Sequence, residues 1–191
     1  MLKDLILASR SYRSFDSSVQ IDEETLFDLI DHARLCPSSI NMQMLKFRPV
    51  YTATECDTVL KNTKWAAKLQ NVTLPPPNHA PTAYIVICAD SSVIATADKF
   101  QKDVGICAQT IMLAATEKGL GGCMIGSFSA KKLAEDLALP STVTPQLVLA
   151  LGKPAEKVEI VDAAPDGTVT YYRENGIHYV QKRALKDLIL K

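Results

Sequence analysis

The spacing of apolar residues along the chain predicts two well-marked helices. The first follows Asp22, a residue that can cap a helix, and Pro37 predicts its end near Cys36. The second and longest runs from about 98 to 118, and Gly119 can end it. The apolar stripes of the two helices are Leu26, Leu29, Ile30 and Ala33, and then Val104, Ala108, Ile111 and Ala115.

Mostly apolar runs predict strands between and after these helices. Residues 83–88 are nearly all apolar, as expected for a central strand that is buried on both faces. Residues 146–151 form a second such run, which Gly152-Lys153-Pro154 ends. The run 47–51 contains Pro49, which indicates an edge strand or a bulge. Further helices are expected over 2–8, over 54–70, after Ser129 and at the C-terminus, so the class is mixed α and β.

Composition narrows the class of protein. The chain has 191 residues and a hydrophobic fraction of 47%, which suits one globular domain over 1–191. Its 21 basic and 21 acidic residues cancel, which argues against disorder and against a dedicated nucleic-acid binder. No apolar run approaches the roughly 18 residues of a membrane helix, and no secretory signal is expected at the N-terminus.

Cysteines and histidines are too scattered for a metal site or a dithiol motif. The five cysteines are widely spaced and form no C-x-x-C pair. The three histidines are far apart in the sequence. Free thiols in a reducing cytoplasm are therefore expected.

A basic cluster lies near the N-terminus, where Arg10 and Arg13 flank Ser11 and Tyr12. Two guanidinium groups with hydroxyls beside them suit an anionic group such as a phosphate. Taken alone, the cluster is more often a solvated surface turn.

A polar loop, Pro37-Ser38-Ser39-Ile40-Asn41-Met42-Gln43, follows the first helix. Its side-chain amides can donate and accept hydrogen bonds, so they could read a ring that carries both kinds of group. The alternative is an ordinary loop that ends a helix.

A glycine-rich segment, Gly121-Gly122-Cys123-Met124-Ile125-Gly126, follows the longest helix. Its glycines would allow a flat ligand to approach main-chain amides, or they mark a turn between helix and strand. The segment is not a G-x-G-x-x-G fingerprint after a strand, so a Rossmann fold is not supported. Near the C-terminus, Lys182-Arg183 alone indicates a solvated pair, and no G-x-S-x-G motif supports a hydrolase.

In this order and spacing, the motifs resemble those of the nitroreductase family of FMN-dependent oxidoreductases. The resemblance runs along nearly the whole chain. Its most specific parts are Arg10-Ser11-Tyr12-Arg13-Ser14-Phe15, the Pro-Ser-Ser-x-Asn-x-Gln loop at 37–43, Asp103-Val104-Gly105, Gly119-Leu120-Gly121, Met124-Ile125-Gly126, Gly152-Lys153-Pro154 and Lys182-Arg183.

The resemblance implies an α+β fold with a central, mainly antiparallel mixed sheet flanked by helices. It also implies a homodimer with two FMN molecules at the subunit interface. NADH or NADPH would reduce FMN in a ping-pong cycle, and nitroaromatics, quinones or a related small acceptor would then be reduced. The flavin would carry the chemistry, so no catalytic side chain is expected.

The resemblance also implies roles for individual residues. Arg10 and Ser11 would contact the FMN phosphate and ribityl chain, and Lys182 or Arg183 would complete the phosphate site. Arg13 would lie nearer the pyrimidine edge of the flavin. The other subunit would contribute Pro37, Ser38, Ser39 and Asn41, and Gln43 of the same loop is also a candidate. Ile125 and Gly126 would back the ring, with the Gly126 amide near flavin N5.

Two departures from the family pattern bear on the site. Ser9 stands where many relatives have a basic residue, which would weaken phosphate binding. Met44-Leu45 replaces the usual Pro-aromatic pair, which puts the shape of the substrate pocket in doubt.

Four further residue types have open roles. Trp65, with Ala66-Ala67 after it, fits a pocket roof or a packed core equally well, and Asp103 fits a structural role. His79 is a candidate to face substrate, whereas Cys36 and Cys123 are assigned none.

Three other functions remain open at this point. The protein could bind flavin without turnover, as a sensor or store. It could be a dehalogenase-like member of the same fold. It could also be an unrelated α/β protein whose basic clusters are merely solvated.

Overall fold

A computed structural model describes residues 1–66, 69, 72–93 and 101–190. Its helices are α1 (Leu2–Ala8), α2 (Glu23–Arg34), α3 (Ala53–Asn62), α4 (Gln101–Glu117) and α5 (Ala130–Asp136). Short 3₁₀ turns cover Ser39–Asn41 and Leu185–Asp187. The strands are β1 (Phe15–Asp16), β2 (Leu45–Val50), β3 (Ala83–Asp90), β4 (Gly121–Ile125), β5 (Val143–Pro154), β6 (Lys157–Asp162), β7 (Tyr172–Glu174) and β8 (Ile177–Lys182).

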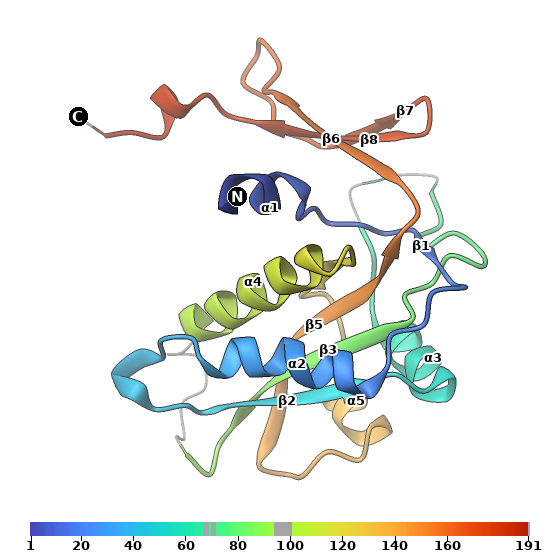
Figure 1. Ribbon diagram of the computed structural model, residues 1–191, viewed down its shortest axis with the longest axis vertical. Helices are drawn as coiled ribbons and strands as arrows, with labels where there is room; N and C mark the ends of the chain where they lie inside the picture. Colours follow the sequence, from blue (N-terminus) through green and yellow to red (C-terminus); the bar gives the residue numbers. More distant parts are fainter. Residues whose placement is uncertain (67–68, 70–71, 94–100, 191) are drawn as a thin grey trace.

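The central sheet is antiparallel in each strand pairing that the described residues make. Strand β5 pairs with β3 on one side and with β4 and β1 on the other, and β2 borders β3. Helices α2 and α4 cover one face of this sheet, and α3 and α5 cover the other (Figure 1). The arrangement confirms the predicted α+β class with helices on a mainly antiparallel sheet.

Strand β3 divides its side chains between two cores, because successive side chains of a strand point to opposite faces. Ala83, Ile85 and Ile87 pack with α2 and α4, whereas Tyr84 and Val86 pack with α3 and α5. All eight residues of the strand are buried, as the apolar run predicts.

Local signals fixed several boundaries correctly. The side chain of Asp22 accepts a hydrogen bond from the Thr25 amide and caps α2. Gly119 follows α4 with a φ of 71°, in the left-handed region that favours glycine. The stripe of α4 that was expected to face the core is buried at Val104, Ala108, Ile111 and Ala115.

Three predicted elements were wrong in extent. Helix α3 ends at Asn62 rather than near 70, because Thr63 leaves the helix and pairs with Phe128. Strand β5 does not end before Gly152 but continues to Pro154, where it pairs with β1. Residues 121–125 form strand β4 instead of a turn.

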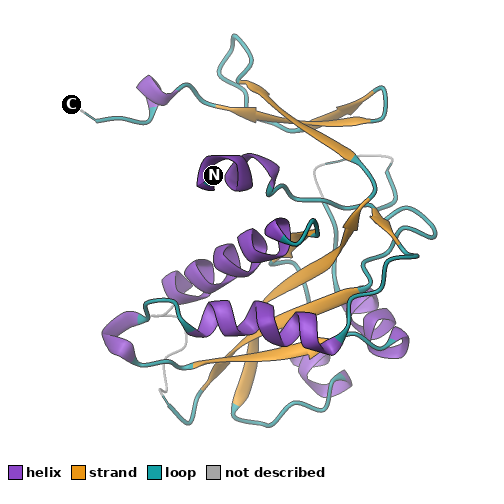
Figure 2. Cartoon of the chain, viewed as in Figure 1, coloured by secondary structure: helices purple, strands orange, loops and turns teal. Residues whose placement is uncertain are grey.

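A second sheet, which the sequence analysis did not predict, follows the central one. Strand β8 lies between β6, which runs parallel to it, and β7, which forms an antiparallel hairpin with it. This C-terminal sheet lies beyond α1 from the central sheet, at the top of the view, as the separate group of orange strands in Figure 2 shows.

Candidate functional site

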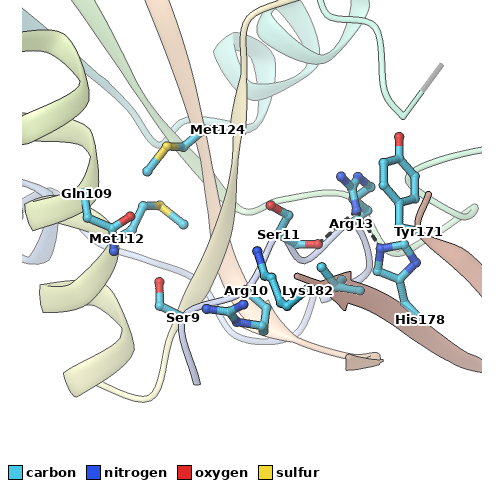
Figure 3. Close-up of a pocket in the computed structure, with 11 residues that line it drawn as sticks. Ser9, Arg10, Ser11, Arg13, Gln109, Met112, Met124, Tyr171, His178 and Lys182 are labelled. Atoms are coloured by element: carbon cyan, nitrogen blue, oxygen red, sulfur yellow. Dashed lines mark hydrogen bonds between the residues drawn. The ribbon is translucent and has the colours of Figure 1, made fainter. Parts of the chain in front are cut away.

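A cleft of about 340 Å³ opens between the N-terminal segment, α4, β4 and the C-terminal sheet (Figure 3). Arg10, Arg13 and Lys182 give it a basic lining, with Ser9 and Ser11 beside them. Helix α4 and strands β4 and β8 add an apolar lining of Met112, Met124 and Val180. A cleft of this size, with clustered cations and an apolar wall, suits a small ligand that is anionic at one end.

The segment that carries Arg10 and Arg13 is held against strand β4. The Tyr12 amide donates a 2.9 Å hydrogen bond to the Gly122 carbonyl, and Ser11 bridges to Gly122. A Cβ on Gly121 would lie 2.6 Å from the Tyr12 ring, and one on Gly122 would lie 2.0 Å from the Ala150 carbonyl oxygen. These two glycines therefore serve close packing within the chain, whereas Gly126, the third glycine of the segment, has open space where a Cβ would stand.

Arg10 has an unused donor at the cleft. Its Nη2 donates to the Ile6 carbonyl at 2.5 Å, whereas its buried Nε has no hydrogen-bond partner among the described residues. Burial lowers the pKa of this guanidinium, because the charged form loses solvation. An anion in the cleft would supply the missing partner and restore the lost solvation.

Arg13 faces the C-terminal sheet. Its Nη1 donates to the Ser11 carbonyl at 3.1 Å and lies 3.3 Å from His178 Nε2. Its guanidinium carbon stands 5.4 Å from the centre of the Tyr171 ring, within the range of a cation–π contact. These contacts and the guanidinium are visible together in Figure 3.

His178 is neutral in this arrangement. It is 1% exposed, and its burial, followed by the charges of Arg13 and Arg173, lowers its pKa to about 4. Because a guanidinium can only donate, Nε2 accepts from Arg13 and the ring proton resides on Nδ1. Buried Nδ1 has no partner in the described ranges.

The basic pair near the C-terminus divides between the cleft and solvent. Lys182, the last residue of β8, lines the cleft. Arg183 follows the strand, is exposed and does not line it. Of the two candidates for the phosphate site, the geometry therefore places Lys182 beside Arg10 and Ser11.

The polar loop at 37–43 does not reach this cleft within one chain. Pro37 and Asn41 are exposed, and Ser38 and Gln43 line a separate cavity of about 240 Å³ beside Cys36. Ser39 is held by Asp103, a contact that gives Asp103 the expected structural role. A shared site for this loop and the basic cluster would need a second copy of the chain, as the resemblance implies.

Strand β4 presents Met124, rather than Ile125, to the cleft. Successive side chains alternate along the strand, so Ile125 packs in the core with α3 and α5. The Ile125 side chain cannot line the cleft, although its main chain leads directly to exposed Gly126. A ligand contact at the Gly126 amide stays a prediction.

Other residues with open roles lie outside the cleft. Trp65 packs against the α3–α5 core and donates its indole N–H to Thr63 at 3.0 Å. His79 Nδ1 lies 3.0 Å from the Phe15 carbonyl oxygen, away from the cleft lining. All five cysteines are free, and burial raises the pKa of the Cys123 thiol. Part of the roof proposed around Trp65, at Ala67, lies outside the described residues.

Sequence reasoning missed the contributions of α4 and of the C-terminal sheet to the cleft. Tyr171 and His178 carry no recognisable motif, and they reach the cleft only because β7 and β8 form a hairpin. The available signal was Asn175-Gly176, a hairpin turn pair, followed by the β-branched and aromatic residues of Ile177-His178-Tyr179-Val180. Among the described residues, no helix is long and apolar enough to span a membrane, and no cluster of three metal-ligating side chains occurs.

Comparisons with known proteins agree with one another. Residues 6–153 match the family model described as "Nitroreductase family". A protein of Methanothermobacter thermautotrophicus, which carries the name NADH dehydrogenase/NAD(P)H nitroreductase, is 27% identical over 157 residues. The match covers 80% of this chain and 77% of that protein.

Solved structures share the fold. A Desulfovibrio desulfuricans nitroreductase in complex with FMN superposes with a TM-score of 0.72 at 21% identity, covering 100% of this chain and 95% of that one. A Staphylococcus epidermidis NAD(P)H:FMN oxidoreductase gives a TM-score of 0.70 at 18% identity, with 91% and 96% covered.

Proposed function

Because the chain belongs to the nitroreductase family, we propose that it is an FMN-dependent oxidoreductase that transfers electrons from NADH or NADPH to a small oxidised acceptor. The observation that carries the proposal is the cleft, where Arg10, Arg13 and Lys182 gather in a chain whose net charge is zero. The FMN complex of the Desulfovibrio relative supports the choice of cofactor.

The cleft's donors fit the phosphate end of FMN. A phosphate monoester carries close to two negative charges at neutral pH and offers three acceptor oxygens. Arg10 supplies an unpaired buried Nε, Ser11 an exposed hydroxyl, and Lys182 an ammonium group at the end of β8. These residues would hold the phosphate, and the apolar side chains Met112 and Met124 would border the less polar part of the cofactor.

When bound, FMN supplies the hydride and electron transfer. The protein binds, orients and polarises the cofactor. Arg13 would place a positive charge on the cleft wall and so favour negative charge on the adjoining part of the ligand. Met112 and Met124 would limit the access of water to the same region. No protein nucleophile is required, which agrees with a cleft that holds cations and thioethers rather than a catalytic triad.

The acceptor belongs to a class that takes up a hydride or two electrons, such as quinones or nitroaromatics. In a ping-pong cycle, the nicotinamide donor leaves before the acceptor enters, so both use one binding region in turn. A cytoplasmic location agrees with the five free cysteines.

A homodimer would complete this site. Exposed apolar residues cluster in α1, at Leu2, Ile6 and Leu7, and in the tail, at Leu185, Leu188 and Ile189. Such surfaces are expected where a second chain packs. In the dimer, the loop at 37–43 would reach the cleft of the partner and add its hydroxyl and amide groups.

The deciding experiment combines cofactor identification with turnover. The purified protein should be yellow and release about one FMN per chain on denaturation, and light scattering should give twice the chain mass of 20.9 kDa. It should then oxidise NADH or NADPH when menadione or a nitroaromatic is added. FMN without turnover would favour a flavin sensor or store, and a colourless protein that refuses added FMN would refute the proposal.

A further inference from the structure

The C-terminal sheet closes one side of the cleft and meets it at Arg13. This sheet lies beyond residue 153, where the match to the family model ends. Its inward face carries His178, Val180 and Lys182, which alternate along β8, and all three line the cleft. The C-terminal sheet therefore forms one wall of the cleft, in addition to extending the fold beyond the central sheet.

Glu156 joins this sheet to the N-terminal segment. Its carboxylate accepts a hydrogen bond from the main-chain N–H of Arg13 and pairs with the guanidinium of Arg173 on β7. The Glu156 side chain is only 6% exposed, so both contacts are shielded from water. One buried carboxylate thus fixes the main chain of Arg13 to the strand that faces β8.

The side chain of Arg13 is fixed by two rings. Nε2 of His178 lies 3.3 Å from its Nη1, and its guanidinium carbon lies over the Tyr171 ring, 5.4 Å from the ring centre. The two rings also touch each other edge to face, with centroids 5.4 Å apart. Apart from the carbonyl of neighbouring Ser11, these are the contacts that the described residues give to the guanidinium.

We propose that His178 is a positioning residue, which holds the Arg13 guanidinium against the cofactor cleft and makes the C-terminal sheet part of the cofactor site. The inference rests on the proposed function, because the cleft must hold FMN for the position of Arg13 to matter. An arginine side chain has many rotamers, and a buried neutral acceptor selects the one that faces the ligand. Arg13 held in this way would favour the reduced, more negative state of the flavin.

The test compares two replacements of the same residue. His178→Gln keeps an acceptor oxygen near the position of Nε2, whereas His178→Leu removes the acceptor at similar volume. Tyr179→Phe is the matched control, because Tyr179 lies on the opposite face of β8, stacked on Tyr172. For each protein, circular dichroism checks the fold, titration of the apoprotein gives the FMN dissociation constant, and dye-coupled reduction gives the flavin midpoint potential.

We expect His178→Leu to bind FMN roughly tenfold more weakly and to show a lower midpoint potential, consistent with the loss of one charge-assisted contact. His178→Gln and Tyr179→Phe should stay close to the parent protein in both measurements. If a folded His178→Leu matches the parent protein, or if folded His178→Gln is as impaired as His178→Leu, the positioning role is refuted.

A parent protein that binds no FMN would instead refute the proposed function. If His178→Leu does not fold, Tyr171→Leu removes the cation–π contact on the same guanidinium. A lowered midpoint potential in Tyr171→Leu would support the role of this wall, and an unchanged one would overturn it.

Discussion

The carboxylate of Asp103 accepts two hydrogen bonds from Ser39, one from its main-chain nitrogen at 2.9 Å and one from its hydroxyl at 2.7 Å. The contact ties the start of α4 to a loop in an unusual conformation. Ile40, Asn41 and Gln43 have φ values of 47°, 54° and 49°, in the left-handed region. That region is costly for a β-branched residue such as Ile40, so the loop keeps its shape only where its surroundings hold it.

Replacing Asp103 should release this loop. Asp103→Asn places an amide N–H where the carboxylate accepted, and Asp103 is only 2% exposed, so water cannot compensate. We expect the free energy of unfolding to fall by about 2 kcal/mol, measured by urea denaturation, together with faster hydrogen exchange at the Ser39 amide. Asp57→Asn, at an exposed position on α3, is the control. Unchanged hydrogen exchange at the Ser39 amide would show that the loop keeps its conformation without Asp103.

The neighbouring residues Lys182 and Arg183 provide a paired test of the phosphate site. Only Lys182 lines the cleft, so Lys182→Ala should weaken FMN binding by roughly tenfold, as loss of one charge-assisted contact predicts. Arg183→Ala removes the same charge one residue away and should change the affinity by less than about twofold. Fluorescence titration of FMN into each apoprotein measures both. Equal losses of FMN affinity in the two variants would mean that FMN binding depends on the overall charge near the cleft and not on Lys182 itself.

Protonation of His178 should destabilise the fold in weakly acidic solution. Its pKa falls from 6.5 in the unfolded chain to about 4 in the folded one, because of burial and of the charges on Arg13 and Arg173. Glu156, which pairs with Arg173, is the facing acid. The unfolded chain therefore takes up a proton on His178 at a higher pH than the folded one does. The contribution of neutral His178 to the free energy of unfolding is complete above pH 6.5 and is lost progressively as the pH falls toward 4.

The melting temperature should therefore decline across this pH range, and the decline should be shallower in His178→Gln, which has no ring to protonate. Differential scanning fluorimetry from pH 7.5 to 4 compares the two proteins. Parallel curves would show that His178 does not titrate in this interval.

Two glycine substitutions should have opposite effects. A methyl group on Gly122 would meet the Ala150 carbonyl oxygen at 2.0 Å, a main-chain atom that cannot move aside. Gly122→Ala should therefore cost more than about 4 kcal/mol of folding free energy. Gly105 lies within α4 with open space where a Cβ would stand, so Gly105→Ala should stabilise the protein by about 0.5–1 kcal/mol. Denaturant melts rank the three proteins, and a tolerated Gly122→Ala would contradict the close approach of Gly122 on β4 to the Ala150 carbonyl on β5.

Local chemistry made much of the central fold predictable. The cap at Asp22, the stop at Gly119 and the buried run at 83–88 each depend on residues that are neighbours in sequence. The length of α3 did not follow from such signals. Helical spacing continues past Asn62, but the pairing of Thr63 with Phe128 overrides it, and that partner lies far along the chain.

The candidate site was predictable where its chemistry lies in one short segment. Arg10, Ser11 and Arg13 do share the cleft with Lys182. The glycine pair at 121–122 was compatible with ligand approach or with a turn, but both glycines lie in β4, and the space beside them is filled by Tyr12, Pro154 and the Ala150 carbonyl. Asn175-Gly176 marks the hairpin that carries Tyr171 and His178, but their role depends on contacts of this sheet with Arg13, which lies far away in the sequence.

The cleft has walls from two segments that are far apart in the sequence, one carrying Arg10 and the other Lys182. During synthesis, the ribosome releases the Arg10 segment long before it has made the strand that ends at Lys182. The central sheet can therefore assemble around its two cores while the cleft is still open on one side. The cleft gains its second wall only when β8 has been made, so cofactor binding by both walls follows the synthesis of Lys182.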